Sequence, residues 1–298
     1  MEGMDGPYLG KLRVWEGWVP TAVQDPPTLV AGKGLPAPQH LAYYADQLYA
    51  REALSPISHR PPTDEGAEPY TLQWFLHIEN QRHRRQGRWI PRLLEFTKHS
   101  GETLLGLGNG LGTDWLQYAR HEAEVIVCSP AAEQLALIRR NFELRGLGGR
   151  FLHARASCLP LENDSIDVVC LNSDVQEVGE PHMVVDEIYR VLKPGGKVLA
   201  VAAARYDVDY WSDWCYPWRW LAPAATMVQP VRFSRRELRR LFGRFTEHRI
   251  HKRHLRRAET PHLCRLIPLS ILERLMGHLL VLKAFKPLSA AIGHQLAA

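Results

Sequence analysis

Short apolar segments alternate with amphipathic segments through the middle of the chain. Compact apolar runs indicate buried strands, and apolar residues three or four positions apart indicate helices that bury one face. The pattern predicts strands over residues 104–107, 125–128, 151–154, 166–171 and 197–203, and helices over residues 114–120, 131–144 and 183–192. Alternating strands and helices form a mostly parallel sheet with helices on both faces. The sequence therefore predicts an α/β fold whose ligands bind beyond the carboxyl ends of the strands.

Helical spacing also occurs on both sides of this central region. Residues 70–96 predict one or two helices that lead into it. Ser234 and Glu237 form a capping-box pattern that predicts the start of a helix, and Gly243 is placed to end that helix. Residues 271–285 again carry apolar residues at helical spacing. We therefore expect a last helix there, near the end of the chain.

Changes of composition divide the chain into three segments. Nine of the 21 prolines precede residue 63, so residues 1–66 are expected to form an irregular Pro/Gly-rich N-terminal arm. Residues 67–250 form the predicted α/β domain, and residues 206–232 are a Trp-rich insertion in it. Residues 251–298 are expected to form a basic, helical C-terminal extension. One large domain with extensions suits the length of 298 residues.

The insertion concentrates aromatic residues after the last predicted strand. It holds Tyr206, Tyr210, Trp211, Trp214, Tyr216, Trp218 and Trp220. These side chains could form a wall for a flat or lipophilic substrate, or they could pack a small subdomain. A third interpretation is an anchor at a membrane interface, beside the basic segment that follows.

Composition is that of an ordinary globular protein, with 45% hydrophobic and 23% charged residues. No apolar stretch approaches the roughly 20 residues that cross a bilayer. The first residues lack the pattern of a secretory signal, so we expect a cytoplasmic protein. The five cysteines contain no C-x-x-C pair, which argues against a disulfide framework and against a zinc site.

Positive charge concentrates between Arg235 and Arg257, where Lys and Arg far outnumber Glu. Such a segment could contact nucleic acid or an anionic membrane surface, but a solvated helix face is the preferred interpretation because no RNA-binding motif accompanies it. His248, His251 and His254 stand among these cations, which repel a metal ion. We therefore expect no metal site.

A glycine loop follows the first predicted strand of the domain. Gly108, Gly110 and Gly112 stand directly before a predicted helix. Glycines let the backbone adopt positive φ and approach a ligand closely. Tight turns between strands and helices use glycine for steric reasons too, so the loop alone leaves a ligand-binding role open.

Several motifs in order give the loop a context. The motifs are the loop at 104–114, Cys128-Ser129-Pro130, Leu159-Pro160-Leu161 before 164–169, and the run EIYRVLKPGG at 187–196. With them, residues 70–245 resemble the class I S-adenosylmethionine (SAM)-dependent methyltransferases, in particular the bacterial group of small-molecule and ubiquinone or menaquinone methyltransferases. The resemblance implies a Rossmann-like fold and SAM as cofactor. It places the cofactor at Gly106, Gly108, Asn109, Gly110, Gly112, Val127, Cys128, Arg155, Ala156 and Asn172.

Three positions depart from the family. Gly106, Val127 and Arg155 stand where the family usually carries acids that contact SAM. Loss of a charged hydrogen-bond partner costs about 1.5–3 kcal/mol. These exchanges also make the site less favourable for the sulfonium cation and more favourable for an anionic ligand. Arg155 could pair with such an anion, or it could be a solvated surface residue.

Asp174 and Glu177 follow the fourth predicted strand and are the candidate catalytic bases. Solvated loop acids are the alternative interpretation. The resulting hypothesis is a SAM-dependent methyltransferase of a small, aromatic or lipophilic molecule. The alternative is a catalytically degenerate methyltransferase fold that serves as a partner or regulatory subunit, or that binds a different, anionic ligand.

Overall fold

The computed structural model describes residues 70–288, except residues 109, 173–180, 216–231, 261–263 and 265. The predicted N-terminal arm lies outside the described residues. Among those that are described, no helix has the length and apolar character needed to cross a membrane. All the elements below therefore belong to the central and C-terminal parts of the chain.

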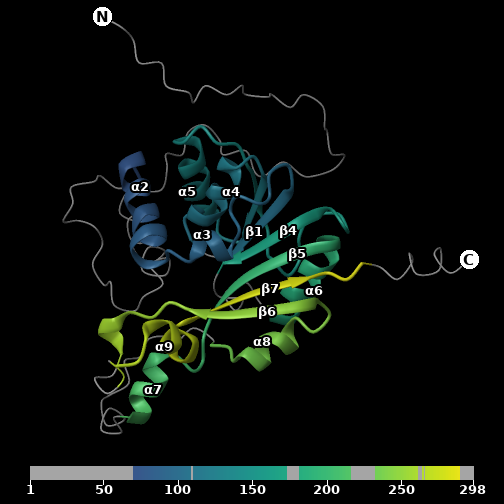
Figure 1. Ribbon diagram of the computed structural model, residues 1–298. Coiled ribbons are helices and arrows are strands. Elements are labelled where there is room, and N and C mark those ends of the chain that lie inside the picture. Colours follow the sequence, from purple (N-terminus) through teal and green to yellow (C-terminus); the bar gives the residue numbers. More distant parts are fainter. Residues whose placement is uncertain are drawn as a thin grey trace, which may run out of the picture. The chain divides into compact units, whose positions relative to one another are not determined.

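Seven strands form one twisted sheet (Figure 1). They are β1 (Thr103–Gly108), β2 (Glu124–Ser129), β3 (Arg150–His153), β4 (Ile166–Asn172), β5 (Leu192–Ala203), β6 (Thr246–Arg253) and β7 (Leu279–Phe285). Their order is β3-β2-β1-β4-β5-β7-β6, and β7 runs in the opposite direction to the other six strands. The carboxyl ends of the other six strands therefore lie along one edge of the sheet, and all five strands predicted in the domain are confirmed.

Helices cover both faces of the sheet, as predicted (Figure 1). The helices are α2 (Leu72–Asn80), α3 (Ile90–Leu93), α4 (Thr113–Arg120), α5 (Ala132–Glu143), α6 (Pro181–Val191), α7 (Val208–Cys215), α8 (Arg235–Leu241) and α9 (Leu269–Met276), with a π-helix at Gln81–Gln86 and a 3₁₀ turn at Arg257–Glu259. One core cluster joins α3, α4 and α5 to the sheet, and another joins α6 and α8 to the opposite face.

Local chemistry explains where α8 begins. The Ser234 side chain accepts a hydrogen bond from the Glu237 backbone N–H at 3.2 Å, and the Glu237 carboxylate accepts from the Ser234 N–H at 2.8 Å. These two bonds satisfy donors that the first helical turn leaves without partners. The predicted capping box is therefore confirmed.

The prediction of one helix over residues 271–285 is wrong in its second half. Helix α9 ends at Met276, and Leu279–Phe285 is strand β7, placed between β5 and β6. A strand between two neighbours with helices on both faces is apolar throughout, so its sequence lacks the alternation typical of half-exposed strands. Such a run is indistinguishable from a buried helix by spacing alone. The segment after residue 250 therefore completes the sheet.

Candidate cofactor site

The glycine loop leaves β1 at the carboxyl edge of the sheet. Gly108 ends β1 and pairs with Asn172, which ends β4. Gly108 and Gly110 have φ of 115° and 130°, which L side chains rarely adopt. The buried side chain of Gln134 donates hydrogen bonds to both glycine carbonyls, at 3.3 Å and 3.0 Å respectively, while its own oxygen accepts one from the Ser129 hydroxyl at 2.7 Å. Side chains from β2 and α5 thus fix the loop backbone.

Gly106 lies in the middle of β1, beneath the indole of Trp115. A Cβ built on Gly106 would lie 2.7 Å from the Trp115 ring, closer than real Cβ contacts. The Trp115 indole N–H donates to the Cys170 carbonyl at 3.3 Å, which fixes the ring across β1 and β4. The indole of Trp115 therefore fills the space that the side chain of the family's usual acid would need.

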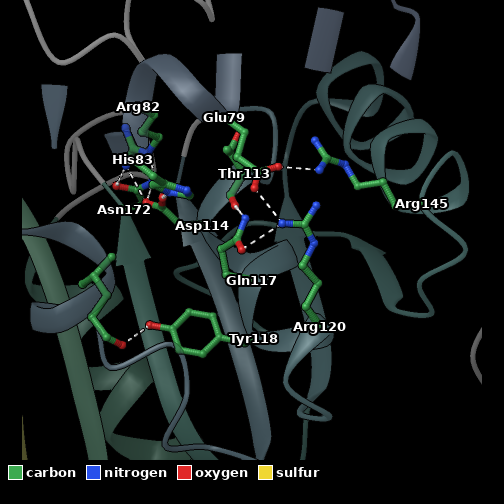
Figure 2. Close-up of polar contacts among 11 residues, drawn as sticks. Glu79, Arg82, His83, Thr113, Asp114, Gln117, Tyr118, Arg120, Arg145 and Asn172 are labelled. Carbon is green, nitrogen blue, oxygen red and sulfur yellow. Dashed lines mark hydrogen bonds and ion pairs between the residues drawn. The ribbon is translucent and has the colours of Figure 1, made fainter. Parts of the chain in front are cut away.

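A buried charged network lies beside the loop (Figure 2). Arg82 donates from Nε to Asp114 Oδ1 at 2.7 Å and from Nη2 to Asp114 Oδ2 at 2.5 Å. His83 Nε2 lies 2.8 Å from Asp114 Oδ1. Asn172 donates to Asp114 at 2.9 Å and accepts from Arg82 at 3.2 Å. We call these four residues the Asp114 network.

The charges of the Asp114 network balance one another. Asp114 is 1% exposed and Arg82 is 3% exposed. Burial would raise the pKa of the Asp114 carboxyl, but Arg82 and His83 hold that pKa well below its usual range. The carboxylate is therefore ionised at neutral pH and paired with a guanidinium, which is the condition under which a buried charge is tolerated.

Helix α2 positions this network through a second set of ion pairs (Figure 2). Glu79, near the end of α2, accepts from Arg120 of α4 at 2.6 Å and also pairs with Arg145, which follows α5. The π-helix that carries Arg82 and His83 begins directly after α2. The Glu79 contacts therefore hold these two side chains against α4.

The remaining predicted cofactor residues divide between core and surface. Gly112 caps the N-terminus of α4 with φ of 74°. Val127 and Cys128 are buried in β2, and burial raises the pKa of the Cys128 thiol to about 12. Ala156 is buried, whereas Arg155 is exposed. The structure therefore brings together Gly108, Gly110 and Asn172 at the loop and places Arg155 outside the core.

Three predicted residues cannot be placed. Asn109, Asp174 and Glu177 lie outside the described residues. Within the Trp-rich insertion the structure describes Tyr206, Tyr210 and Trp211 with their side chains. Their rings contact edge to face, with centroids 5.1 Å apart for the tyrosine pair and 5.7 Å apart for Tyr210 and Trp211.

The basic segment from Arg235 to Arg257 is not one helix face, contrary to the preferred interpretation of the sequence. Its first part forms α8 and its middle forms strand β6. Arg244 pairs with Asp186 on α6 at 3.1 Å, and Lys252 is buried. The positive charge is divided because two different elements carry it, and their side chains face different surroundings.

A second buried cluster lies near the start of β7. His278 lies 3.3 Å from a carboxylate oxygen of Asp207 and 3.3 Å from one of Glu259. Burial would lower the pKa of His278, but the two carboxylates raise it to about 9. Asp207, Asp209 and His278 have the geometry of a metal-ligand group. However, Arg232 already pairs with Asp207 at 2.7 Å, and a protonated histidine is not a ligand.

Sequence reasoning did not identify Arg82, His83, Asp114 or Gln134 as parts of this site. Arg82 and His83 stand in a polar run typical of a solvated helix, and Asp114 is the first residue of the helix predicted over residues 114–120. One signal was available, because an Asp in the first turn of the helix after a glycine loop points back toward the loop. Its arginine partner, 32 positions earlier, could not be inferred.

The sheet order and the loop define the class of protein, the Rossmann-like methyltransferase fold. The family model described as a methyltransferase domain matches residues 104–200. Residues 104–200 therefore form a methyltransferase domain, which confirms the resemblance to the class I SAM-dependent methyltransferases inferred from the motifs.

Curated relatives support this assignment. A demethylmenaquinone methyltransferase of Clavibacter sepedonicus is 36% identical over 34% of this chain and 40% of its own length. A second demethylmenaquinone methyltransferase, from Thermus thermophilus, is 32% identical over 38% of this chain and 53% of its own length. The chain therefore spans about half the length, or less, of these relatives.

Solved structures share the fold. One chain from the complex of the Haloferax volcanii Trm112 methyltransferase activator with a methyltransferase has a TM-score of 0.50 and 19% identity, and the match covers 74% of this chain and 99% of that one. A geranyl diphosphate methyltransferase solved with SAM has a TM-score of 0.50 and 18% identity, over 77% of this chain and 95% of that one. At this level of identity the likeness shows the fold alone.

Proposed function

We propose that this protein transfers a methyl group from SAM to a small molecule with an aromatic or lipophilic body. The observation that carries the proposal is the glycine loop, which leaves β1 at the carboxyl edge of the sheet with its backbone fixed by Gln134. Ligands of open α/β sheets bind at this edge. The demethylmenaquinone methyltransferases among the relatives support a small acceptor with an aromatic or lipophilic body.

The loop fits a cofactor that must approach the backbone closely. Gly108 and Gly110 present no Cβ, and their positive φ would strain any other residue. We propose that the cofactor lies along Gly108, Asn109, Gly110, Gly112, Cys128, Arg155, Ala156 and Asn172. Gly106 and Val127 then act through packing, because Trp115 covers Gly106 and Val127 is fully buried.

Asp114 places a carboxylate near the glycine loop, whereas Gly106 replaces the acid that the family usually carries. The Asp114 carboxylate bonds to Asn172, which pairs with Gly108 at the end of β1. Asp114 is neutralised by Arg82 and both side chains are buried, so we propose that they act on the cofactor site by holding Asn172 in place at the end of β4.

The chemistry required of the protein itself is modest. When bound, SAM supplies a methyl group on a sulfonium sulfur, and a nucleophilic atom of the acceptor displaces that sulfur. The side chains must hold the acceptor in line with the methyl group and exclude water, and positioning alone provides a large acceleration. Asp174 and Glu177 stay candidates for the base that removes a proton from a hydroxyl acceptor.

Two further predictions accompany this proposal. The cysteines described by the structure, Cys128, Cys158, Cys170 and Cys264, are free thiols, and we propose a cytoplasmic location because that compartment keeps thiols reduced. The arm at 1–66 and the start of the domain at residue 67 stay predictions, whereas the predicted boundary between the domain at 67–250 and the extension at 251–298 falls inside strand β6.

Calorimetric titration with SAM and with S-adenosylhomocysteine tests the proposal. The protein is first stripped of co-purified ligand. We expect micromolar binding that is lost in Gly110→Ala, because a Cβ there strains the loop and blocks the ligand. Gly146→Ala is the matched control, since Gly146 also has positive φ but faces open space. Absence of binding of either ligand to the folded wild-type protein would overturn the proposed function.

A further inference from the structure

A cavity of 410 Å³ opens where the carboxyl ends of β5 and β6 meet the start of β7. Helices α7 and α9 lie together near this end of β6 and β7 (Figure 1). The lining residues are Ala204, Tyr206, Trp211, Phe233, Ser234, Arg235, Arg236, Lys252, Arg274, Leu275 and Leu280. We call this space the basic cavity.

Among the residues that the structure describes, the lining of the basic cavity carries four cationic side chains and no carboxylate. Within the part of the chain that the structure describes, neither Arg236 nor Arg274 has an ion-pair partner within 4.0 Å. The nearest acids along the sequence are already engaged, because Glu237 pairs with Arg205 and Glu273 pairs with Arg253. Two exposed guanidinium groups therefore face the cavity with their hydrogen-bond donors available.

Lys252 adds a buried charge to the same cavity. Its ammonium donates to the backbone carbonyls of Tyr206 and Leu275, so part of its role is to fix the loop before α7 and the end of α9. Burial and the nearby Arg235 lower the pKa of Lys252 to about 8, whereas Asp207 raises it. Positive charges crowd one another here, and an anion in the cavity would relieve that repulsion.

Aromatic and aliphatic side chains complete the wall. Tyr206 and Trp211 lie on one side, and Phe233 continues the wall from the segment before α8. Leu275 and Leu280 supply aliphatic surface. A cavity with apolar walls and a few convergent charged groups is the usual form of a small-molecule site.

The basic cavity lies on the same sheet edge as the glycine loop. Asn172, at the end of β4, pairs with Val201 of β5, and Ala204 lies three residues further along the chain. At about 3.3 Å per residue, the cavity wall begins about 10 Å beyond Asn172 on the adjacent strand. A molecule held by its anionic end in the cavity could therefore extend its body toward the glycine loop.

We propose that the basic cavity binds the oxyanion of a small molecule with an aromatic or lipophilic body, and that this molecule is the methyl acceptor. The oxyanion is a carboxylate or a phosphate, which Arg236 and Arg274 bind through charge-assisted hydrogen bonds. The ring or chain of the acceptor packs on Tyr206, Trp211 and Phe233. The identification of this molecule as the methyl acceptor rests on the proposed function, whereas the anion site does not.

Fluorescence titration with 1-anilinonaphthalene-8-sulfonate tests the anion site directly. The neutral analogue N-phenyl-1-naphthylamine has a similar aromatic body without the charge. We expect the anionic probe to bind at least tenfold more tightly than the neutral one, and Arg236→Gln with Arg274→Gln to remove that preference. Arg239→Gln with Arg240→Gln on the same helix should leave it unchanged, because these residues do not line the cavity. Displacement by 2-naphthoate or by 2-naphthyl phosphate then tells a carboxylate site from a phosphate site.

The outcomes separate the two proposals. Equal affinity for the two probes, or an unchanged preference in the Arg236/Arg274 double variant, would overturn the anion site. Displacement of the probe by anionic phospholipid vesicles but by neither soluble anion would also overturn it, in favour of a membrane surface. Titration with S-adenosylhomocysteine is independent, so selective probe binding without cofactor binding would refute the proposed function and keep the anion site. Circular dichroism of each variant checks that it is folded.

Discussion

Two charged regions lie on the same edge of the sheet, and their arginines differ in burial and in ion pairing. In the Asp114 network, Arg82 is 3% exposed and both oxygens of a buried carboxylate accept its hydrogen bonds. In the basic cavity, Arg236 and Arg274 are exposed, and none of the lining residues that the structure describes carries a carboxylate. The first arrangement closes on itself and supports the fold. In the basic cavity the two guanidinium groups have no ion-pair partner among the described residues. Such unpaired charge does not stabilise the fold, but an anionic ligand could bind to it.

The largest expected effect comes from breaking the Asp114 network. Asp114→Ala leaves Arg82 buried without its carboxylate, and loss of one partner of a buried ion pair costs about 3–5 kcal/mol. Urea unfolding measures this free energy. The control is Asp186→Ala, which removes the exposed pair with Arg244 and should cost less than about 0.5 kcal/mol. Replacing both partners, Arg82→Met with Asp114→Leu, should recover much of the loss. Similar costs for the two single variants would show that the network is not a closed structural unit.

The second effect is a pH dependence from His278, beside the basic cavity. Its pKa in the folded protein is about 9, above the value of 6.5 for a free histidine, so its stabilising contribution is complete below pH 6.5 and is lost as the pH rises through 9. The size is about 3 kcal/mol, at about 1.4 kcal/mol per pKa unit. The measurement is the unfolding free energy from pH 6 to 10 for the wild type and for His278→Asn. Lys252 contributes in the opposite direction above pH 8 in both proteins, so their difference isolates His278. Parallel pH curves would contradict the assigned charge.

The third effect concerns the packing of Gly106 beneath Trp115. Gly106→Ala places a Cβ 2.7 Å from the indole, and overpacking of this kind costs about 1–3 kcal/mol. Thermal unfolding measures the loss, and Trp115→Leu in the same chain should reduce it by opening space. Gly148→Ala, where a Cβ meets nothing within 4 Å, is the matched control. A neutral Gly106→Ala would mean that Trp115 does not hold this place.

The smallest effect is expected in the basic cavity. Arg236→Gln with Arg274→Gln removes two exposed cations that lack ion-pair partners among the described residues, so the unfolding free energy should change by less than about 0.5 kcal/mol. The same urea experiment measures it. A loss of 2 kcal/mol or more would place these arginines with Arg82, as parts of the fold, and would remove the contrast between the two regions.

The strands and helices of the α/β domain could be predicted from the sequence, because they depend on local chemistry. The strands from Thr103 to Ala203 and the helices between them follow from compact apolar runs and helical spacing, and the Ser234 capping box follows from two residues three positions apart. The loop at Gly108 and Gly110 is identifiable because only glycine adopts such φ without strain. Each of these signals lies within a few residues, where backbone preferences act.

The ion pairs could not be predicted from the sequence, because the paired residues are distant in sequence. Asp114 meets Arg82, and His278 meets Asp207, only after helices and strands have packed. Strand β7 is similar, since its apolar run fits a helix or a strand until β5 and β6 enclose it. The sequence by itself determined the elements from Thr103 to Ala203, the glycine loop and the resemblance to methyltransferases. The tertiary structure decided which charges are neutralised and which face a cavity, because electrostatic energies depend on distance and burial, and these arise only when the sheet is assembled.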